Sequence, residues 1–318
     1  MNPLADDLAT LRRNLGPFGV WAGGPALERS DPGELAGFVE ALGYTALWIG
    51  GGNPDRAAFA RLATMLSATD RLVVATGIAN LWAWDPDRLA VEASRLHASF
   101  PGRFLLGIGV SHAPLVERLG HRYERPVEAM AGFLDDLDRA APAPGIDLSA
   151  IGPTPRVLAA LGDRMLRLAA GRSHGAHPYL TTPDHTERAR TVLGPAPLLA
   201  PEQALVADPD VDRGRRTARA YLERYLRLPN YRRSLTGLGF SEHDLDGDGS
   251  DRLVDAVVPH GSSDGLVTAA RAHLDAGADH VCIQPLTPTG DLDRYALELL
   301  GPALRAVAAK EPPPDRHR

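Results

Sequence analysis

The feature that most constrains the fold is a regular alternation of short apolar segments with helical segments. Helices are predicted where a capping residue precedes a proline, as in Asp31-Pro32, Asp85-Pro86 and Thr182-Pro183. Eight apolar segments have the length and composition of buried strands: residues 18–21, 45–49, 71–78, 104–106, 156–160, 175–179, 198–206 and 280–284. Because buried strands that alternate with helices form a parallel sheet, the sequence predicts an α/β fold, a (β/α)8 TIM barrel.

A doubly wound sheet is the alternative fold for such an alternation. It is disfavoured because no Gly-x-Gly-x-x-Gly sequence joins the first strand to its helix. The barrel is expected to form one domain over residues 1–310, with an irregular polar insertion at 229–250 before the last helix (262–276) and strand. The Pro-rich, charged segment 311–318 is expected to be a disordered tail.

Charge and cysteine content exclude several classes of protein. The 34 basic and 40 acidic residues give a net charge of −6 without a basic tract, so nucleic acid is not an expected partner. No apolar run reaches the length of a membrane span, and the first 15 residues lack the apolar core of a signal peptide. Cys282 is the single cysteine, which fits a reducing cytoplasm.

The fourth strand has the clearest features of a binding site. It lies in the stretch Arg103–His112, where an apolar run is followed by Gly107-x-Gly109 and then by Ser111 and His112. The glycines would let the backbone approach a flat ligand, and the two polar side chains would lie at the carboxyl end of a strand, where barrels bind ligands. A buried strand with a glycine bulge is the alternative.

Four motifs occur in order along the chain: 47–50 (Leu-Trp-Ile-Gly), 76–80 (Thr-Gly-Ile-Ala-Asn), 101–112, and 276–281 (Ala-Gly-Ala-Asp-His-Val). Together they resemble the luciferase-like monooxygenase superfamily, in particular its branch of coenzyme F420 (deazaflavin) dependent oxidoreductases from actinobacteria. The resemblance implies a barrel with a deazaflavin or flavin across the carboxyl ends of the strands. It also implies a homodimer and a small-molecule substrate.

The resemblance assigns the cofactor ring to the ends of three strands. The implied contacts are Trp48, Gly50, Gly77, Ile78, Ala79, Asn80, Gly109, Val110, Ser111 and His112. Many members carry a bulge with a non-proline cis peptide at the end of the third strand, which places it at Gly77–Ile78 or a neighbouring bond. The alternative there is a plain strand end.

The segment 173–178 resembles the phosphate-binding turn of the family. His174, Gly175, Ala176, His177 and Pro178 are therefore expected to bind the cofactor, with free backbone N–H groups at Gly175 and Ala176. Two histidines three residues apart also suggest a metal, but no cysteine lies nearby, so no metal site is expected. Plain loop packing is the other alternative.

Tryptophans mark the expected substrate wall. All four lie at or just beyond predicted strand ends, and we expect Trp21 and Trp82 to face the substrate. Trp48 lies inside its strand, so packing is the alternative to cofactor contact.

His112 is the candidate catalytic residue. Deazaflavin-dependent dehydrogenases often carry an Asp-His pair after the second strand, where this chain has Gly51-Gly52-Asn53. His112 is the best remaining group at a strand end that could move a proton near neutral pH. The alternative is that His112 only hydrogen-bonds the cofactor.

An acidic stretch imitates a calcium-binding loop. Asp244, Asp246 and Asp248 precede Gly249, as at the start of an EF-hand. A polar turn whose Ser250 caps the next helix explains the stretch better, because the twelfth position is the short Asp255.

The sequence thus predicts an oxidoreductase that transfers a hydride between F420 and an organic substrate. The alternatives are an FMN-dependent monooxygenase and a barrel that binds a cofactor or metabolite without turnover.

Overall fold

Parallel strands form a ring in the computed structural model, which describes residues 10–23, 27, 29–50, 57–289 and 291–309. The strands are β1 (Phe18–Ala22), β2 (Ala46–Ile49), β3 (Val73–Thr76), β4 (Ala79–Asn80), β5 (Phe104–Gly109), β6 (Arg156–Leu158), β7 (Gly175–Ala176), β8 (Leu198–Leu199), β9 (Glu202–Leu205) and β10 (Val281–Pro285). Their order is β8-β7-β6-β5-β3-β2-β1-β10-β9, with β4 also paired to β5.

The two ends of this order belong to one chain segment. β8 and β9 are separated only by Ala200 and Pro201, and β8 pairs with β7 while β9 pairs with β10. β3 and β4 are likewise two pieces of one strand on either side of Gly77–Ile78. The described strands therefore occupy eight positions around a ring, which confirms the TIM barrel.

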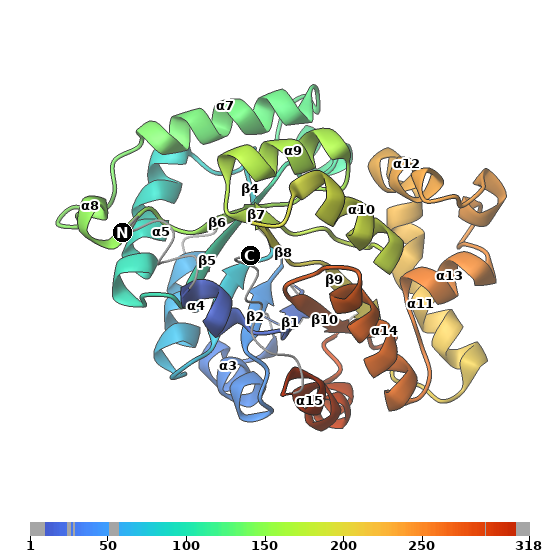
Figure 1. Ribbon diagram of the computed structural model, residues 1–318. Coiled ribbons are helices and arrows are strands. Elements are labelled where there is room, and N and C mark those ends of the chain that lie inside the picture. Colours follow the sequence, from blue (N-terminus) through green and yellow to red (C-terminus); the bar gives the residue numbers. More distant parts are fainter. Residues whose placement is uncertain (1–9, 24–26, 28, 51–56, 290, 310–318) are drawn as a thin grey trace.

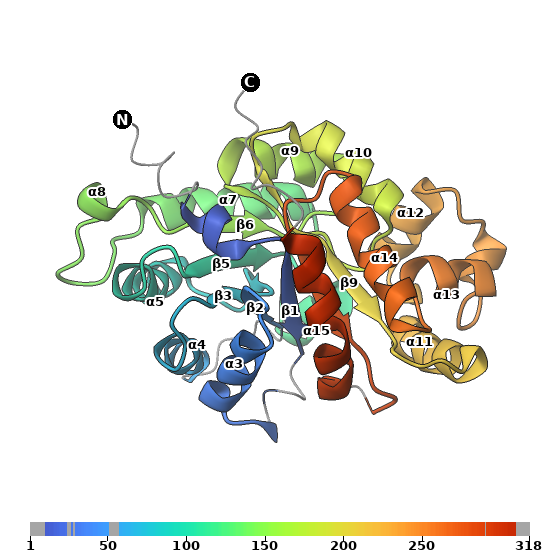
Figure 2. The ribbon, with the colours of Figure 1, turned by 60° about the horizontal axis from the view of Figure 1, so that its bottom comes forward.

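Helices surround the ring of strands (Figures 1 and 2). They are α3 (Pro32–Ala41), α4 (Ala58–Ser67), α5 (Pro86–Ser99), α6 (Ala113–Arg118), α7 (Pro126–Arg139), α8 (Leu148–Ile151), α9 (Asp163–Arg172), α10 (Pro183–Leu193), α11 (Val211–Leu226), α12 (Pro229–Gly237), the 3-10 helix η1 (Glu242–Leu245), α13 (Asp251–Val257), α14 (Ser263–Asp275) and α15 (Arg294–Ala308).

The predicted caps are confirmed. Asp31 accepts a hydrogen bond from the Glu34 N–H at 3.0 Å, and Asp85 accepts one from Arg88 at 2.9 Å. Each cap satisfies a donor that the first helical turn would otherwise leave free, which stabilises the helix by about 1 kcal/mol.

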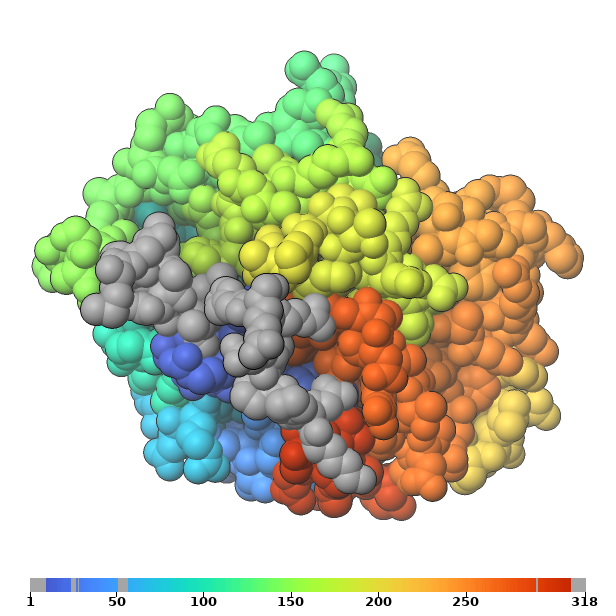
Figure 3. Space-filling view, viewed as in Figure 1, coloured from blue at the N-terminus to red at the C-terminus, as the bar shows by residue number. Residues whose placement is uncertain are grey.

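The insertion is helical, so the prediction of an irregular segment at 229–250 is wrong for its first part. Residues 229–237 form α12, which buries Tyr231 and Leu235 on one face. Pro229 at the first helical position and the four-residue spacing of these two side chains were the available signals. With α11 and α13, α12 forms a lobe beside the barrel (Figures 1 and 3). The chain also continues beyond the expected last helix, since α15 follows β10.

Apolar side chains fill the space inside the ring and the space between strands and helices. The inner cluster includes Trp48, Val73, Leu105, Val157 and Cys282, all fully buried. Burial of each large side chain contributes about 1.5–3 kcal/mol, so this interior is a packed core and not a channel. Among the helices that the structure describes, none is long and apolar enough to cross a membrane.

Candidate functional site

A cavity of about 770 Å³ opens at the carboxyl ends of the strands. Residues that follow β3, β5, β6 and β7 line its inner part, and residues from α7, α9, α10, α11 and α12 line its outer part. A pocket of this size at this end of a TIM barrel is where such folds bind ligands.

Glycines of β5 allow the bulge that separates β3 from β4. A Cβ on Gly107 would collide with the carbonyl oxygen of Thr76, and one on Gly109 would lie 2.5 Å from Ile78 Cδ1. The Thr76 hydroxyl bridges the gap, since it accepts from the Gly107 N–H at 2.7 Å and donates to the Gly107 carbonyl at 2.8 Å. Ile78 is thereby placed on the cavity wall.

The bulge expected at this strand end is therefore present, but the cis peptide is not. All peptide bonds among the described residues are trans, including Gly77–Ile78. A trans bulge suffices because Gly107 leaves room for the Thr76 carbonyl.

His112 lies on the cavity wall directly after the β5 loop. Its ring is 5.5 Å from that of Tyr231, and its Nδ1 is buried without a hydrogen-bond partner among the described residues. Burial lowers the pKa of His112, so the imidazole is neutral at pH 7. A neutral imidazole can accept or donate one proton, as acid–base chemistry requires.

Two further unpartnered polar atoms belong to the cavity wall. His177 Nδ1 lies 2.7 Å from the Ala200 carbonyl oxygen, which can only accept, so Nδ1 carries the proton and Nε2 is an acceptor. That Nε2 and the donor Nε1 of Trp21 have no partner within the described part of the chain. Because unpaired buried polar groups are costly, a ligand with polar edges fits this wall.

Tyrosine hydroxyls form a fixed cluster on the other side of the cavity. The Tyr179 hydroxyl donates to Gln284 at 2.8 Å and accepts from Tyr221 at 2.8 Å and Tyr225 at 3.1 Å. Tyr179 and Tyr225 both line the cavity, and the Tyr179 ring lies 5.2 Å from that of Trp21. The cluster gives the cavity a rigid aromatic wall suited to a planar ligand.

A buried carboxyl group supports this cluster from behind. Glu202 Oε2 accepts from the Leu180 N–H at 2.9 Å, while Oε1 has no partner among described atoms. Burial raises the pKa of Glu202 to about 8, so the group is protonated at neutral pH. Its bond to Leu180 holds the turn that presents Tyr179 to the cavity.

Left-handed backbone conformations also gather here. Ser111, Arg125 and Leu180 are the non-glycine residues with positive φ among those described, at 56°, 44° and 56°. Ser111 and Arg125 line the cavity. Leu180 directly follows Tyr179, which also lines the cavity. Such conformations are unfavourable for non-glycine residues and cluster at functional sites.

The structure brings together many of the residues expected in the site. Those that line the cavity are Trp21, Gly77, Ile78, Asn80, Val110, Ser111, His112 and His177.

Trp48, Gly50, Ala79 and Gly109, four of the residues expected to contact the cofactor, do not line the cavity. Trp48 is fully buried inside the ring and stacks on His177 at 4.4 Å. Gly50 leaves room for the Trp21 indole, with which a Cβ would collide. Ala79 and Gly109 are buried partners in the β4–β5 pairing region. These residues shape the wall from behind.

The segment 173–178 does not form the turn that was expected there. Gly175 and Ala176 form β7, and the N–H groups of His174 and His177 donate to the carbonyls of Arg156 and Leu158, both at 2.8 Å. Gly175 is required because a Cβ would collide with the Leu198 carbonyl of the neighbouring strand.

The other polar groups of this segment are also engaged. His174 Nδ1 accepts from the Arg156 N–H at 3.1 Å, at the amino ends of the strands, and the Pro178 carbonyl accepts from Glu202 at 2.9 Å. The segment is therefore structural, except for His177.

Trp82 does not face the cavity. Its Nε1 donates to the Val110 carbonyl at 2.9 Å, and its ring lies 5.7 Å from His121. Trp82 therefore holds the Val110 loop, and its expected substrate contact stays a prediction. Gly51–Asn53, where the family's Asp-His pair would stand, lie outside the described residues.

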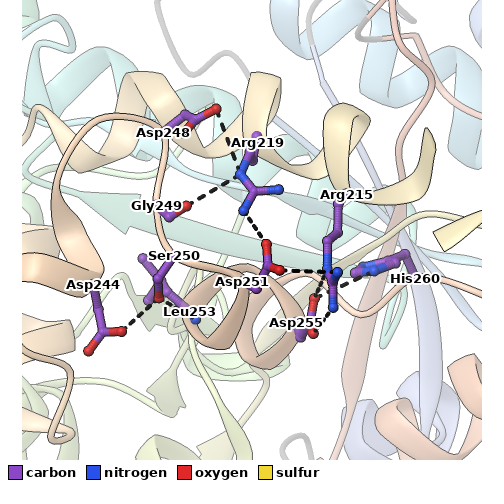
Figure 4. Close-up of polar contacts among 10 residues, drawn as sticks. All are labelled: Arg215, Arg219, Asp244, Asp248, Gly249, Ser250, Asp251, Leu253, Asp255 and His260. Atoms are coloured by element: carbon purple, nitrogen blue, oxygen red, sulfur yellow. Dashed lines mark hydrogen bonds and ion pairs between the residues drawn. The ribbon is translucent and has the colours of Figure 1, made fainter. Parts of the chain in front are cut away.

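The acidic stretch 244–255 is engaged in contacts with protein side chains (Figure 4). Asp244 accepts from the Ser250 hydroxyl at 2.6 Å, and Ser250 caps α13 through the Leu253 N–H at 3.2 Å, as expected. Arg215 and Arg219 of α11 both form ion pairs with Asp251. In addition, Arg215 pairs with Asp255 and Arg219 pairs with Asp248. The stretch thus fixes α13 to α11.

Sequence reasoning missed the outer half of the cavity. The missed lining residues are Leu115, Tyr123, Arg125–Glu128, Ala159–Met165, Tyr179, Arg188, Tyr225, Asn230, Tyr231 and Arg233. The turn 159–162 directly follows β6, so the strand-end rule could have found it. The tyrosines and arginines of α7, α11 and α12 had no such signal, because only the tertiary packing brings their helices over the barrel.

Comparison with known proteins agrees with this geometry. A family profile described as luciferase-like monooxygenase matches residues 17–193, more than half of the chain. The chain belongs to the luciferase-like monooxygenase family. A search of curated protein sequences gave no significant match.

Several solved structures share the fold. An F420-dependent secondary alcohol dehydrogenase in complex with an F420-acetone adduct has a TM-score of 0.68 at 15% identity, covering 92% of this chain and 99% of its own. The coenzyme F420 dependent tetrahydromethanopterin reductase from Methanopyrus kandleri has 0.67 at 16%, covering 92% and 99%. The oxygenating constituent of 3,6-diketocamphane monooxygenase from Pseudomonas putida, in complex with FMN, has 0.67 at 18%, covering 95% and 100%.

Proposed function

We propose that this luciferase-like protein is an oxidoreductase that transfers a hydride between coenzyme F420 and a small organic substrate. The observation that carries the proposal is that Trp21, His112 and His177, each with a buried polar atom unpartnered among the described residues, line one cavity at the carboxyl ends of the strands. The order of the sequence motifs favours F420 over FMN. An FMN-dependent monooxygenase is the second candidate, because an FMN complex shares the fold.

The residues present fit a flat ring with polar edges. Trp21 offers a donor and His177 an acceptor at the inner wall, and Ile78 and the aromatic cluster offer flat apolar contacts. The volume of about 770 Å³ has room for a ring and a second small molecule.

The protein would supply binding, orientation and a proton. When bound, the deazaflavin accepts or donates the hydride at C5 of its ring. His112 would take the hydroxyl proton of an alcohol as the hydride leaves the adjacent carbon, or return it to the carbonyl oxygen in the reverse direction. The tyrosine cluster would orient the substrate and exclude water.

Cofactor titration tests the proposal. We expect F420 to bind with micromolar affinity and FMN at least tenfold more weakly, measured by ligand fluorescence. Tighter binding of FMN would favour the monooxygenase, and binding without turnover of any alcohol, carbonyl or oxygen substrate would favour a non-catalytic barrel.

Two tryptophans provide a matched pair for this titration. Trp21→Phe removes an unpartnered donor of the cavity wall and is expected to weaken F420 binding about tenfold, or about 1.4 kcal/mol. Trp84→Phe, outside the cavity lining with its ring packed against Phe59, is the control and should change the affinity less than threefold. Equal effects of both substitutions would contradict the placement of the ring beside Trp21.

A further inference from the structure

We infer that the mouth of the cavity binds an anionic group, a carboxylate or a phosphate, through Arg125 and Arg233. The inference rests on the proposed function only for the molecule that carries the anion, which is either the cofactor tail or the substrate. No feature of the sequence motifs assigns a role to these two residues.

The charge of the cavity is opposite to that of the chain. Four arginines and two carboxylates stand among the described residues that line it, whereas the whole chain has a net charge of −6. The four arginines are Arg125, Arg164, Arg188 and Arg233. A local excess of positive charge in a concave site attracts and retains anions.

Protein carboxylates neutralise only two of these arginines. Arg164 pairs with Glu128 at 2.8 Å, and Arg188 binds both carboxylate oxygens of Asp163 at 3.1 Å. Arg125 and Arg233 form no hydrogen bond or ion pair with any residue that the structure describes. Arg125 and Arg233 are therefore left without a hydrogen-bonded counter-ion. Both side chains are exposed on the cavity wall, and Arg125 lies near enough to Glu128 for its charge to help lower the pKa of that carboxyl group, so the wall keeps a net positive charge.

Arg125 occupies a position that is locally unfavourable for an arginine. It is the N-terminal flanking residue of α7, with φ 44° and ψ 59°, in the left-handed region. The N-terminus of a helix carries partial positive charge, which repels a cation and attracts an anion. Because α7 also begins without a side-chain cap, an anion bound there would satisfy both the helix and the guanidinium.

Arg233 approaches the same mouth from α12. Burial raises the pKa of Tyr123, and the nearby charge of Arg233 opposes that rise, which places Arg233 beside Tyr123 on the lining. Arg233 lies two residues after Tyr231, whose ring contacts that of His112 at 5.5 Å. An anion held at the mouth would thus belong to a ligand that extends inward past the aromatic wall.

The double variant Arg125→Gln/Arg233→Gln tests the inference by binding alone. Arg122→Gln is the matched control, because Arg122 lies on the same segment, outside the lining, with its side chain 89% exposed. The probes are F420 and its tail-less chromophore 8-hydroxy-5-deazariboflavin, together with citrate added to protein loaded with that chromophore. Circular dichroism and thermal midpoints establish that each variant is folded.

Two outcomes support the site and identify the source of the anion. If the cofactor tail is the source, the preference of the protein for F420 over the tail-less chromophore should fall at least tenfold in the double variant and stay unchanged in the control. If the substrate is the source, that preference should persist, while citrate binding to the loaded protein falls at least tenfold and becomes weaker in high salt.

The inference is overturned if the double variant keeps both the tail preference and citrate binding within threefold of wild type. Failure of the proposed function is a separate result, in which the wild type binds neither chromophore. Citrate titration of the cofactor-free wild type and double variant then still decides whether Arg125 and Arg233 bind anions.

Discussion

Two buried histidines on either side of Trp48 show how the two ends of the barrel differ. His280 precedes β10 at the amino end, donates from Nδ1 to the Gly16 carbonyl at 2.8 Å, and accepts from Trp48 at 3.1 Å. His177 follows β7 at the carboxyl end, and only its Nδ1 is paired, with Ala200. Burial lowers the pKa of both to about 4, so they share a neutral state and differ in what they can still bind.

Other groups repeat this difference at the amino end. The Glu40 carboxylate accepts from the N–H groups of Asp70, Arg71 and Leu72 before β3. Arg190 donates to Asp279 at 2.6 Å and to the Gly277 carbonyl at 2.9 Å. Hydrogen bonding of this completeness stabilises the fold and leaves these groups little capacity to bind a ligand.

The carboxyl end keeps that capacity at the expense of stability. Trp21, His112 and His177 each keep a polar atom unpaired, and Ser111 and Arg125 keep left-handed backbones around the same cavity. The comparison teaches that the amino end maintains the barrel while the carboxyl end is prepared for a ligand, as in barrel enzymes generally.

Leucine substitutions of the two histidines should give the largest difference in stability between the two ends of the barrel. His280→Leu leaves two buried groups unpaired, the Trp48 N–H and the Gly16 carbonyl, and should lower the free energy of unfolding by about 4 kcal/mol. His177→Leu leaves only the Ala200 carbonyl unpaired and should cost about 2 kcal/mol, with loss of cofactor affinity. Urea unfolding measures both. Equal losses would mean that the two ends are built alike.

His112→Asn should separate catalysis from stability. The asparagine keeps a hydrogen-bonding side chain but cannot titrate, so turnover should fall at least a hundredfold, about 2.7 kcal/mol, for whichever alcohol or ketone of a panel is a substrate. Cofactor affinity should stay within a few-fold, and the free energy of unfolding within about 1 kcal/mol.

The pH profile of the wild type sharpens this prediction. If neutral His112 accepts the proton, activity should decline on the acid side of the ordinary histidine pKa of 6.5, because burial lowers the pKa. Retained turnover with lost affinity would instead make His112 a cofactor ligand.

Glu202→Gln should change the pH dependence of stability. The pKa of Glu202 is raised to about 8 in the folded protein from 4.5, so the folded state keeps a proton that the unfolded state has lost. The stability of the wild type relative to the variant should be greatest below pH 4.5. It should then decrease by about 1.4 kcal/mol per pH unit up to about pH 8 and level off.

Denaturant unfolding at pH 5, 6.5 and 8 measures this slope, with the exposed Glu117→Gln as the control. A variant that follows the wild type in parallel across this range would show that Glu202 is ionised in the folded protein.

Local chemistry determined the elements that the sequence alone predicts correctly. A cap such as Asp31 acts within three residues, and the alternation of buried strands with helices follows from residue types close in the chain, so the barrel was predictable. The β3 bulge was expected only from the family resemblance of residues 76–80, and Gly107 and Gly109 leave room for it in the structure.

Tertiary structure alone decided which polar groups remain free to bind. His177 is paired through Ala200, 23 residues away, and His280 through Gly16, 264 residues away, so no local pattern distinguishes the open histidine from the closed one. The segment 173–178 has the residue types of a turn but pairs as β7, since its neighbours in the ring supply the partners. Tyr225, Tyr231 and Arg233 reach the cavity only because α11 and α12 pack over the barrel, and hydrogen bonding between distant segments is not encoded in local periodicity.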